Sequence, residues 1–539
     1  MAVREDKLGQ SWLFPPCISD FIPEDHICNL VVAVMSCVDV SEIEAKYLDQ
    51  PGNPAYPRRM LLRLLVQAAI DGIWSSRKID KRAHENVVYM YLAGNEKPDF
   101  RTICNFRRDN KELIEAVFKK TVTVARDLRI LKLGYLATDG TKIKANASNG
   151  YTLSEDELKE IRRLVERGIE IDEEEDKLYG DKRGDELPPE LNTQEKLRKK
   201  IKELEESRGG RLKRAAKSII EQHALGDEHK RARVEDKLER AEYELKEGGQ
   251  SVVSLTDPES LFMENNKERI ELSYNPQITA DHDSGIIVAN DITQDCTDHH
   301  QLQPQVEKTE ETVGELPADT KLGSDNGYFS GANLRYLEEK GLDGYIPDSK
   351  QAGEMKGNKP KVSPFSKDKF EYDEDKDRFL CPNGGILSRR GEYEYKGKPV
   401  HAYYGANCGE CPFRSECAGE GKKRVITSAG YEAERRRMAA KMRLDTGKAE
   451  YKKRSETVEW IFGNIKQNMK FREFLTLGLE SVRTEYNLVC SAHNLKIIWG
   501  KLSRDAAVIG TILGSVTNLA AKVKNFLGFR PVIDLKCQS

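Results

Sequence analysis

Three acidic residues have the surroundings expected of a metal-dependent phosphoryl-transfer site. Asp139 and Asp325 each follow a short run with strand character, at the point where a turn begins, and Glu459 lies in a segment with helical spacing. In open α/β sheets, ligands collect at strand ends. Two such aspartates and a glutamate from a crossing helix can hold two Mg²⁺ ions about 3.5–4 Å apart, an arrangement suited to phosphodiester chemistry. Taken singly, each residue is equally explained as a turn or surface acid.

The segment around Glu459 carries a second polar stripe. Glu459, Gly463 and Lys466 recur at helical spacing, beside an apolar stripe formed by Val458, Ile461, Phe462, Ile465 and Met469. A glycine inside a helix costs about 1 kcal/mol relative to alanine. The spacing alone leaves open why a glycine lies between a carboxylate and a lysine. A solvated surface lysine is the plain interpretation of Lys466.

Four cysteines form a second cluster. Cys381, Cys408, Cys411 and Cys417 include a Cys-x2-Cys pair, which suits a tetrahedral structural Zn²⁺. The spacing of Cys381 is long, so His401 is an alternative ligand, and four reduced thiols in a loop-rich segment are the alternative to a metal site. Eleven cysteines without a secretory signal indicate a reducing cytosol.

The charge of the chain is distributed unevenly. The net charge of −3 hides two basic regions, 57–134 with a net charge of +8 and 421–472 with +9, and an acidic region at 155–190 with −8. A single charged run is commonly a solvated face. Two separate basic regions favour a polyanionic partner.

Residues 20–130 have helical apolar spacing throughout. Within them, "KPDFRTICNFRRDN" predicts a turn followed by a short basic helix, as in a helix-turn-helix DNA reader. Arg101, Arg107 and Arg108 would then contact phosphates. A helical bundle with solvated arginines is the alternative.

From residue 131, strand and helix patterns alternate, which predicts an α/β domain with a mixed sheet. A polar region at 151–250 interrupts it, with a capping box at Ser154 to Glu157. This region has few apolar residues, so we interpret it as a helical insertion without a core of its own. A later helix is expected to be capped by Ser330 and closed by Gly341.

Residues 506–521, "AAVIGTILGSVTNLAA", are short for a membrane span and contain polar side chains. They predict a packed or oligomer-forming helix. We expect no membrane association and a cytoplasmic, nucleoid-associated location.

Several ordered blocks resemble bacterial insertion-sequence transposases of the DDE class. These blocks are "ATDGTKIKANAS", "YNPQITAD", "GIIVANDIT", "SDNGYFSGANLRYLEEKGLDGYIP" and "YKKRSETVEWIFGNIKQNMKFREFLTLGLESVRTEYNLVCSAHNLKII". The N-terminal helices resemble the same group. The resemblance is weakest at 151–250 and after about residue 500.

The resemblance implies a ribonuclease H-like catalytic domain in which Asp139, Asp325 and Glu459 hold Mg²⁺ or Mn²⁺. It also implies a zinc-binding cysteine knuckle before the glutamate block. The chain would bind double-stranded DNA at the ends of its element, cleave a strand and join the freed 3′-hydroxyl to target DNA, as a homodimer on DNA.

The glutamate block of such transposases is Tyr-x2-Arg-x3-Glu-x6-Lys. Tyr451, Arg454, Glu459 and Lys466 match it, except that four residues separate Arg454 from Glu459. Glu456 is the competing glutamate, but it lacks a lysine seven residues later. The resemblance implies DNA contacts for Tyr451, Arg454 and Lys466.

The predicted organisation has three parts: a helical DNA-binding domain at 1–130, a catalytic domain at 131–500 and a tail at 501–539. The catalytic domain contains the insertion at 151–250 and the cysteine-rich insert at 375–420. Two other functions remain open: a transposase-derived DNA-binding protein without catalysis, and a metal-dependent nuclease that does not join strands.

Overall fold

The computed structural model describes residues 17–46, 54–163, 213–224, 228–265, 268–358, 363–395 and 398–503, and the single positions 199, 202 and 206. The predicted helix at 506–521 and nearly all of the predicted tail lie outside these residues. Much of the predicted insertion also lies outside them.

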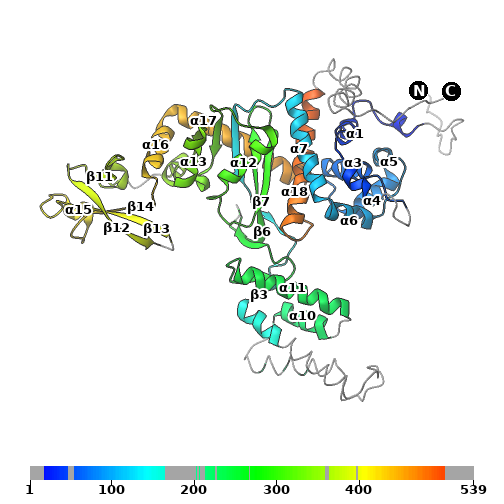
Figure 1. The fold of residues 1–539 in the computed structure, drawn as a ribbon, viewed down its shortest axis with the longest axis horizontal. Helices are drawn as coiled ribbons and strands as arrows, with labels where there is room; N and C mark the ends of the chain where they lie inside the picture. Colours follow the sequence, from blue (N-terminus) through cyan, green and yellow to red (C-terminus); the bar gives the residue numbers. More distant parts are fainter. Residues whose placement is uncertain are drawn as a thin grey trace, which may run out of the picture.

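Within the described residues, a mixed seven-stranded sheet forms the centre of the molecule (Figure 1). Its strands are β1 (Tyr135–Gly140), β2 (Ile143–Lys144), β5 (Leu261–Glu264), β6 (Ile270–Asp281), β7 (Ile287–Thr293), β8 (Lys321–Ser324) and β9 (Asp343–Tyr345). Strands β1, β8 and β9 are parallel neighbours, and β6 lies antiparallel to β1 on its other side. β7 continues the sheet beyond one half of β6, while β2 and β5 pair with its other half.

Helices cover both faces of this sheet. They are α12 (Leu302–Val313), α13 (Gly331–Lys340), α14 (Ser349–Met355), α16 (Glu432–Arg443), α17 (Asp445–Gly463) and α18 (Leu479–Leu502), with a short 3₁₀ turn η3 (Asn326–Tyr328) and a π-helical turn η5 (Asn464–Asn468). α12 and α18 pack on β7, and α17 packs on β1 and β8. The central strands are therefore buried, as expected for a sheet covered by helices. The predicted α/β class is confirmed.

Local signals set several of these boundaries as predicted. The Ser330 hydroxyl accepts a hydrogen bond from the Asn333 amide at the start of α13, and Gly341 ends the helix in the left-handed conformation. Ser154 and Glu157 form the predicted capping box, with the Ser154 amide 2.9 Å from the Glu157 carboxylate.

The N-terminal helices share the hydrophobic core of the sheet. They are η1 (Ile18–Phe21), α1 (Cys28–Ser36), α2 (Ser41–Ala45), α3 (Arg58–Ile70), α4 (Ser76–Glu85), α5 (Val87–Ala93), α6 (Phe100–Asp109) and α7 (Lys111–Asp127). The long α18 packs against α3, α7 and β7 at once, and in Figure 1 it runs beside α7 between the sheet and the other N-terminal helices. One cluster of buried side chains extends from Cys28 to Leu502. The core therefore crosses the boundary predicted at residue 130.

The insertion has a small core of its own, contrary to expectation. Its elements are β3 (Thr152–Ser154), a helix over 155–163, α10 (Arg214–Ala224), α11 (Glu228–Lys246) and β4 (Val252–Ser254). Leu158, Ile219, Leu238 and Leu255 belong to a buried cluster separate from the main core. The expectation was wrong because a few apolar residues at helical spacing are enough to form a small core. The paired strands β3 and β4 contribute to this core beside the helices.

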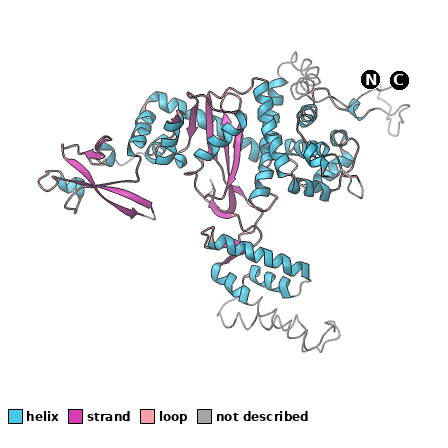
Figure 2. Cartoon of the chain, viewed as in Figure 1, coloured by secondary structure: helices cyan, strands magenta, loops and turns pink. Residues whose placement is uncertain are grey.

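A second unit with its own core carries the cysteine cluster. It contains η4 (Lys367–Lys369), β10 (Glu371–Asp373), β11 (Arg378–Leu380), β12 (Ile386–Tyr395), β13 (Lys398–Gly405), α15 (Arg414–Ala418) and β14 (Val425–Ser428). The five strands form an antiparallel meander. Figure 2 shows it as an arm that projects from the central body, away from the N-terminal helices.

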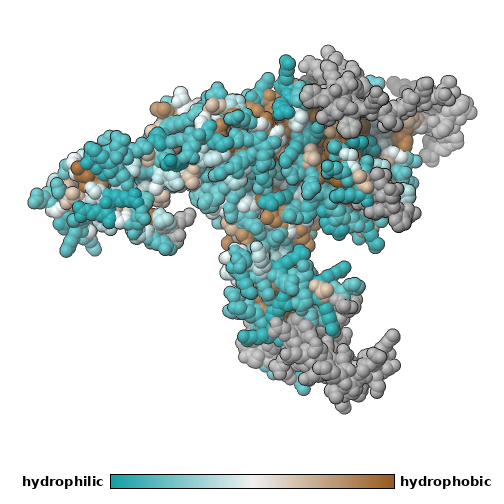
Figure 3. All heavy atoms as spheres, in the orientation of Figure 1, coloured by the Kyte–Doolittle hydropathy of each residue, from teal (hydrophilic) through white to brown (hydrophobic). Residues whose placement is uncertain are grey.

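Hydrophilic side chains dominate the visible face of the body and of both projecting units (Figure 3). Among the described helices, none has the length and apolar content needed to cross a membrane.

A buried histidine fastens α17 and η5 to the rest of the body. The Nδ1 atom of His493 lies 3.1 Å from the Asn464 side-chain amide, and its Nε2 atom lies 3.0 Å from the Gly285 carbonyl oxygen. Its ring also packs against Trp460 at 5.4 Å. Burial lowers the pKa of His493 to about 4, so the folded protein holds it neutral.

We predict that this histidine makes the protein less stable in mild acid. The unfolded chain binds the His493 proton from its ordinary pKa of 6.5, whereas the folded chain resists until about 4. The contribution of neutral His493 to the free energy of unfolding is therefore fully present above the unfolded pKa and is lost as the pH falls toward 4. Between about pH 7 and about pH 5 the loss is on the order of 2 kcal/mol.

Urea unfolding at the two pH values, for wild type and His493→Gln, measures this loss. A glutamine keeps an N–H donor but does not titrate, so the variant should lose less stability than wild type over this interval. Equal losses in both proteins would show that other groups cause the acid sensitivity.

Candidate active site

Asp139 and Asp325 lie side by side at one edge of the central sheet. Thr138 of β1 is paired with Ser324 of β8 in parallel register, so the residues that follow emerge at the same carboxyl edge. The Asp325 carboxylate accepts a hydrogen bond from the Gly327 amide at 2.8 Å, and the Asp139 carboxylate accepts one from the Gly140 amide at 2.9 Å. Both carboxylates are thus held by local backbone groups.

Arg454 of α17 lies between the two carboxylates. Its Nη2 atom is 2.6 Å from Asp139 Oδ2 and 4.0 Å from Asp325 Oδ2. Position 323 in β8 is a glycine beneath this arginine: an added Cβ would overlap the Tyr135 phenol and lie 3.1 Å from the Arg454 Cβ. Burial raises the pKa of Asp139 to about 6, although Arg454 opposes this shift. The neighbouring Tyr451 phenol is half-buried, and its pKa is raised by burial and lowered in part by Arg454.

Lys466 reaches the same edge from the π-helical turn. Its ammonium lies 2.5 Å from the Thr141 hydroxyl and 3.4 Å from the Lys142 carbonyl oxygen. Burial lowers the pKa of Lys466, and Asp139 counteracts that effect. π-Helical turns are rare in proteins, and those that do occur are often found at functional sites. Because α17 ends at Gly463, Lys466 is not on a simple continuation of the helix stripe of Glu459.

Glu459 is exposed on α17 and does not join the two aspartates. In the described part of the chain it makes no hydrogen bond or ion pair, and no group of three or more Asp, Glu, His or Cys side chains is arranged to hold a metal. Glu456 is also exposed and pairs with Lys452 at 3.4 Å. A Cβ at Gly463 would meet nothing within 4 Å, so the helix surface beside Glu459 is open.

Asp298 is an acidic neighbour of the site that the sequence analysis did not single out. It accepts hydrogen bonds at 2.7 Å from the side-chain amides of Asn275 and Gln277, both on β6. An added Cβ on Gly327 would lie 3.4 Å from Asp298 Oδ2 and 2.8 Å from Asp325 Oδ1. Asp298 lies in the polar loop "QDCTDHHQ", where its residue type does not separate it from Asp295.

The three N-terminal arginines occupy different environments. Arg107 is buried, and its Nη1 atom donates to the Trp74 carbonyl oxygen at 3.2 Å. Arg108 is exposed and pairs with Asp109 at 2.6 Å, and Arg101 is exposed near the ring of Phe100. Arg107 therefore contributes to packing inside the protein. Of the three arginines, only Arg101 and Arg108 lie at the surface.

The four predicted zinc ligands line one cavity of about 250 Å³. Cys381 and Cys408 accept hydrogen bonds at 3.5 Å from the backbone amides of Asn383 and Arg424. The alternative ligand His401 does not line this cavity, and lies 3.0 Å from Glu392 on the neighbouring strand.

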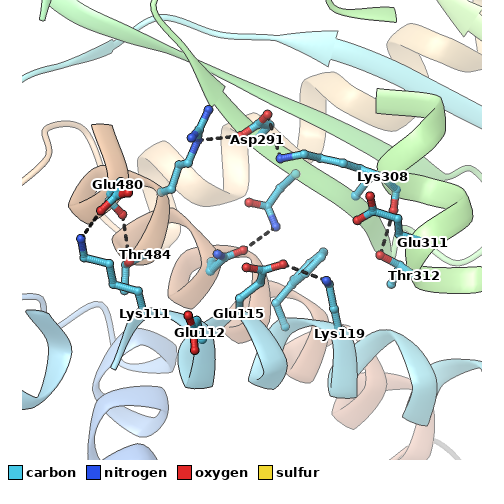
Figure 4. A pocket seen from close by; sticks show the side chains of 15 residues that line it. Lys111, Glu112, Glu115, Lys119, Asp291, Lys308, Glu311, Thr312, Glu480 and Thr484 are labelled. Atoms are coloured by element: carbon cyan, nitrogen blue, oxygen red, sulfur yellow. Dashed lines mark hydrogen bonds and ion pairs between the residues drawn. The ribbon is translucent and has the colours of Figure 1, made fainter. Parts of the chain in front are cut away.

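A separate cavity of about 350 Å³ lies between α7, α12, β7 and α18 (Figure 4). Its cations are paired with acids of the same lining: Lys111 with Glu480, Lys119 with Glu115 at 2.8 Å, and Lys308 and Arg483 with Asp291 at 2.8 and 2.9 Å. Of these pairs, Lys111–Glu480 connects the N-terminal helix α7 to α18, whereas Lys119–Glu115 lies within α7 and the two pairs of Asp291 lie within the central body. None of the predicted site residues lines this cavity.

Two family models match the chain. Residues 380–499 match a transposase DDE domain, and residues 16–109 match a transposase domain known as DUF772. The first match contains Arg454, Glu459 and Lys466. No curated protein matches the chain. Each match covers less than half of the chain, and both are to domains of transposases. Together they indicate an insertion-sequence DDE transposase, as the sequence blocks predicted.

We predict that Gly140→Ala destabilises the protein. An added Cβ would lie 2.2 Å from Gln277 Nε2, 2.8 Å from Asp298 Oδ1 and 2.9 Å from Asn275 Oδ1. Gln277 and Asn275 are buried and hydrogen-bonded, so they cannot move away cheaply. Overpacking of this kind costs about 1–3 kcal/mol.

Gly463→Ala is the matched control, because its added Cβ meets open space in a helical conformation. Urea unfolding should show a loss for the first variant and no loss for the second. A Gly140→Ala protein as stable as wild type would mean that the amides of Gln277 and Asn275 are not fixed.

Proposed function

We propose that the chain is a transposase that cleaves DNA at the ends of its element and joins the freed 3′-hydroxyl to target DNA. The observation that carries this proposal is the convergence of Asp139 and Asp325 on one cationic group at neighbouring strand ends. The strand order β7-β6-β1-β8-β9, with only β6 antiparallel to its neighbours β1 and β7, supports a ribonuclease H-like catalytic domain.

The two aspartates fit a divalent cation. Their oxygens approach the same guanidinium nitrogen of Arg454, so the site already holds positive charge between two carboxylates. Mg²⁺ and Mn²⁺ prefer such oxygen ligands. When bound, the metal supplies activation of the attacking oxygen and stabilisation of the leaving oxygen.

Glu459 is proposed as the third carboxylate. It is exposed on the helix that presents Arg454, and the open surface at Gly463 leaves room for DNA beside it. Lys466, held at the Thr141 hydroxyl, would neutralise a phosphate close to Asp139. Tyr451 and Arg454 would position the strand and balance the charge of the aspartates. The reaction requires two DNA ends, which supports a homodimer on double-stranded DNA.

We also propose a structural Zn²⁺ in the cysteine-bearing arm. The Cys-x2-Cys spacing, the shared cavity and the backbone amides that donate to Cys381 and Cys408 sulfurs support it.

The catalytic assignment predicts that Glu459→Gln abolishes metal-dependent nicking of a duplex that carries the element end. Loss of a metal ligand should reduce the nicking rate by on the order of 100-fold or more. Mutation of residues that only hydrogen-bond to a metal ligand already costs about 10- to 100-fold in activity or metal affinity. Asp139→Asn and Asp325→Asn should behave alike, while DNA binding survives. Gel separation of labelled strands in Mg²⁺ or Mn²⁺ measures the rate.

Glu456→Gln is the matched control, because Glu456 is an exposed glutamate of the same helix. Full activity of Glu459→Gln together with loss in the Glu456 variant would move the third ligand to Glu456. Binding without nicking by wild type would favour a DNA-binding protein without catalysis. Nicking without joining of a precut 3′-hydroxyl end would favour a nuclease.

The zinc proposal predicts about one tightly bound zinc per chain, lost in Cys411→Ser. Elemental analysis of the purified protein measures it. Cys104→Ser, at an exposed cysteine outside the arm, is the control. The proposal would be contradicted if purified wild-type protein contained no zinc and had the same stability against unfolding as Cys411→Ser.

A further inference from the structure

A groove of about 1110 Å³ lies between α4 and the segment that follows η5. It has the largest volume among the cavities described above. One wall is formed by residues between 71 and 85, and the other by residues between 470 and 475. The N-terminal helices and the catalytic body thus each supply one wall.

Direct contacts fix the two walls relative to each other. The Trp74 indole N–H donates to the Met469 carbonyl oxygen at 3.0 Å, and its ring packs edge-on against Phe471 at 4.8 Å. Gly72 has a positive φ of 68°, and a Cβ there would lie 2.9 Å from the Met469 carbonyl oxygen. The groove is therefore a fixed feature of the packing, not a gap between independent domains.

The acids in the groove are engaged by other groups. Asp71 accepts hydrogen bonds from Gln67 and Tyr89, at 3.1 and 2.8 Å. Glu473 pairs with Lys144 at 2.9 Å, outside the groove lining, and Glu85 pairs with Lys81 of the same wall at 3.8 Å.

Three of its cations have no such partner. Lys78, Arg82 and Lys470 are exposed, and in the described part of the chain their side chains make no hydrogen bond or ion pair. The groove therefore presents positive charge that the protein itself does not neutralise.

Two contacts connect the groove to the sheet edge that carries Asp139. The Arg472 guanidinium donates to the Lys466 carbonyl oxygen at 3.0 Å. Lys466 in turn lies at Thr141, two residues after Asp139. A polyanion that leaves the aspartates along Lys466 would enter the groove next.

We propose that this groove binds the sugar-phosphate backbone of the DNA duplex adjoining the cleaved end. The proposal rests on the proposed function, because continuity with the aspartates selects DNA over an acidic protein. Phosphate contacts of this kind set the position of the duplex without reading its sequence.

The test compares two triple variants. Lys78→Ala, Arg82→Ala and Lys470→Ala together remove the unpaired cations of the groove. Lys111→Ala, Lys119→Ala and Lys308→Ala remove the same number of charges from the separate cavity of Figure 4. Fluorescence anisotropy with a short duplex of generic sequence, over a series of salt concentrations, gives the affinity and its salt dependence.

Each phosphate contact contributes about 0.9 to the slope of log affinity against log salt. The groove variant should therefore lose about 2–3 from the slope, and the control variant should keep it. An unchanged slope in the groove variant, or an equal loss in the control, would overturn the proposal. Lys78→Glu alone, in the first turn of α4, repeats the test if the triple variant is unstable.

Nicking of the element end separates the two proposals. Wild type that nicks, with a groove variant of unchanged slope, would refute the groove and leave the catalytic function intact. Wild type that never nicks, with a groove-dependent slope, would refute the catalytic function and support the groove. Competition by a polyglutamate peptide equal to that by DNA would refute the choice of DNA as the partner.

Discussion

The charge balance among Asp139, Arg454 and Asp325 is the constraint on which this edge of the central sheet depends. Two carboxylates at neighbouring strand ends repel each other strongly when they are removed from bulk water. One guanidinium between them offsets that repulsion, and this explains why an arginine is buried at the point where α17 crosses the sheet. Gly323 in β8 lies at the same place, and a side chain there would overlap the Tyr135 phenol and crowd the Arg454 Cβ.

Local signals in the sequence were sufficient for features that depend on neighbouring residues. The cap at Ser330, the turn glycine Gly341 and the placement of Asp139 and Asp325 after strands all follow from residues close by in the chain. The α/β class follows from the alternation of such segments. Two aspartates at the same edge could therefore be expected before the strand order was known.

Features that depend on distant segments could not be predicted in this way. Asp298 approaches the site because the β6 residues Asn275 and Gln277 hold it, and only the pairing of β6 with β1 brings those residues there. Arg107 lies in a basic run, but packing of Trp74 against the catalytic body buries it. Helical periodicity placed Lys466 on the stripe of Glu459, whereas the π-turn changes its direction.

The continuous core beneath the N-terminal helices limits how such an element can diversify. α18 is the last described helix of the chain, yet it packs against α3 and α7 near the beginning. Exchange of the residues before β1 for those of another protein would bring apolar surfaces that the resident α18 does not match. The two projecting units have separate cores, so they can be lengthened, shortened or replaced without repacking the body. Evolutionary change in length is therefore expected to concentrate in these two units.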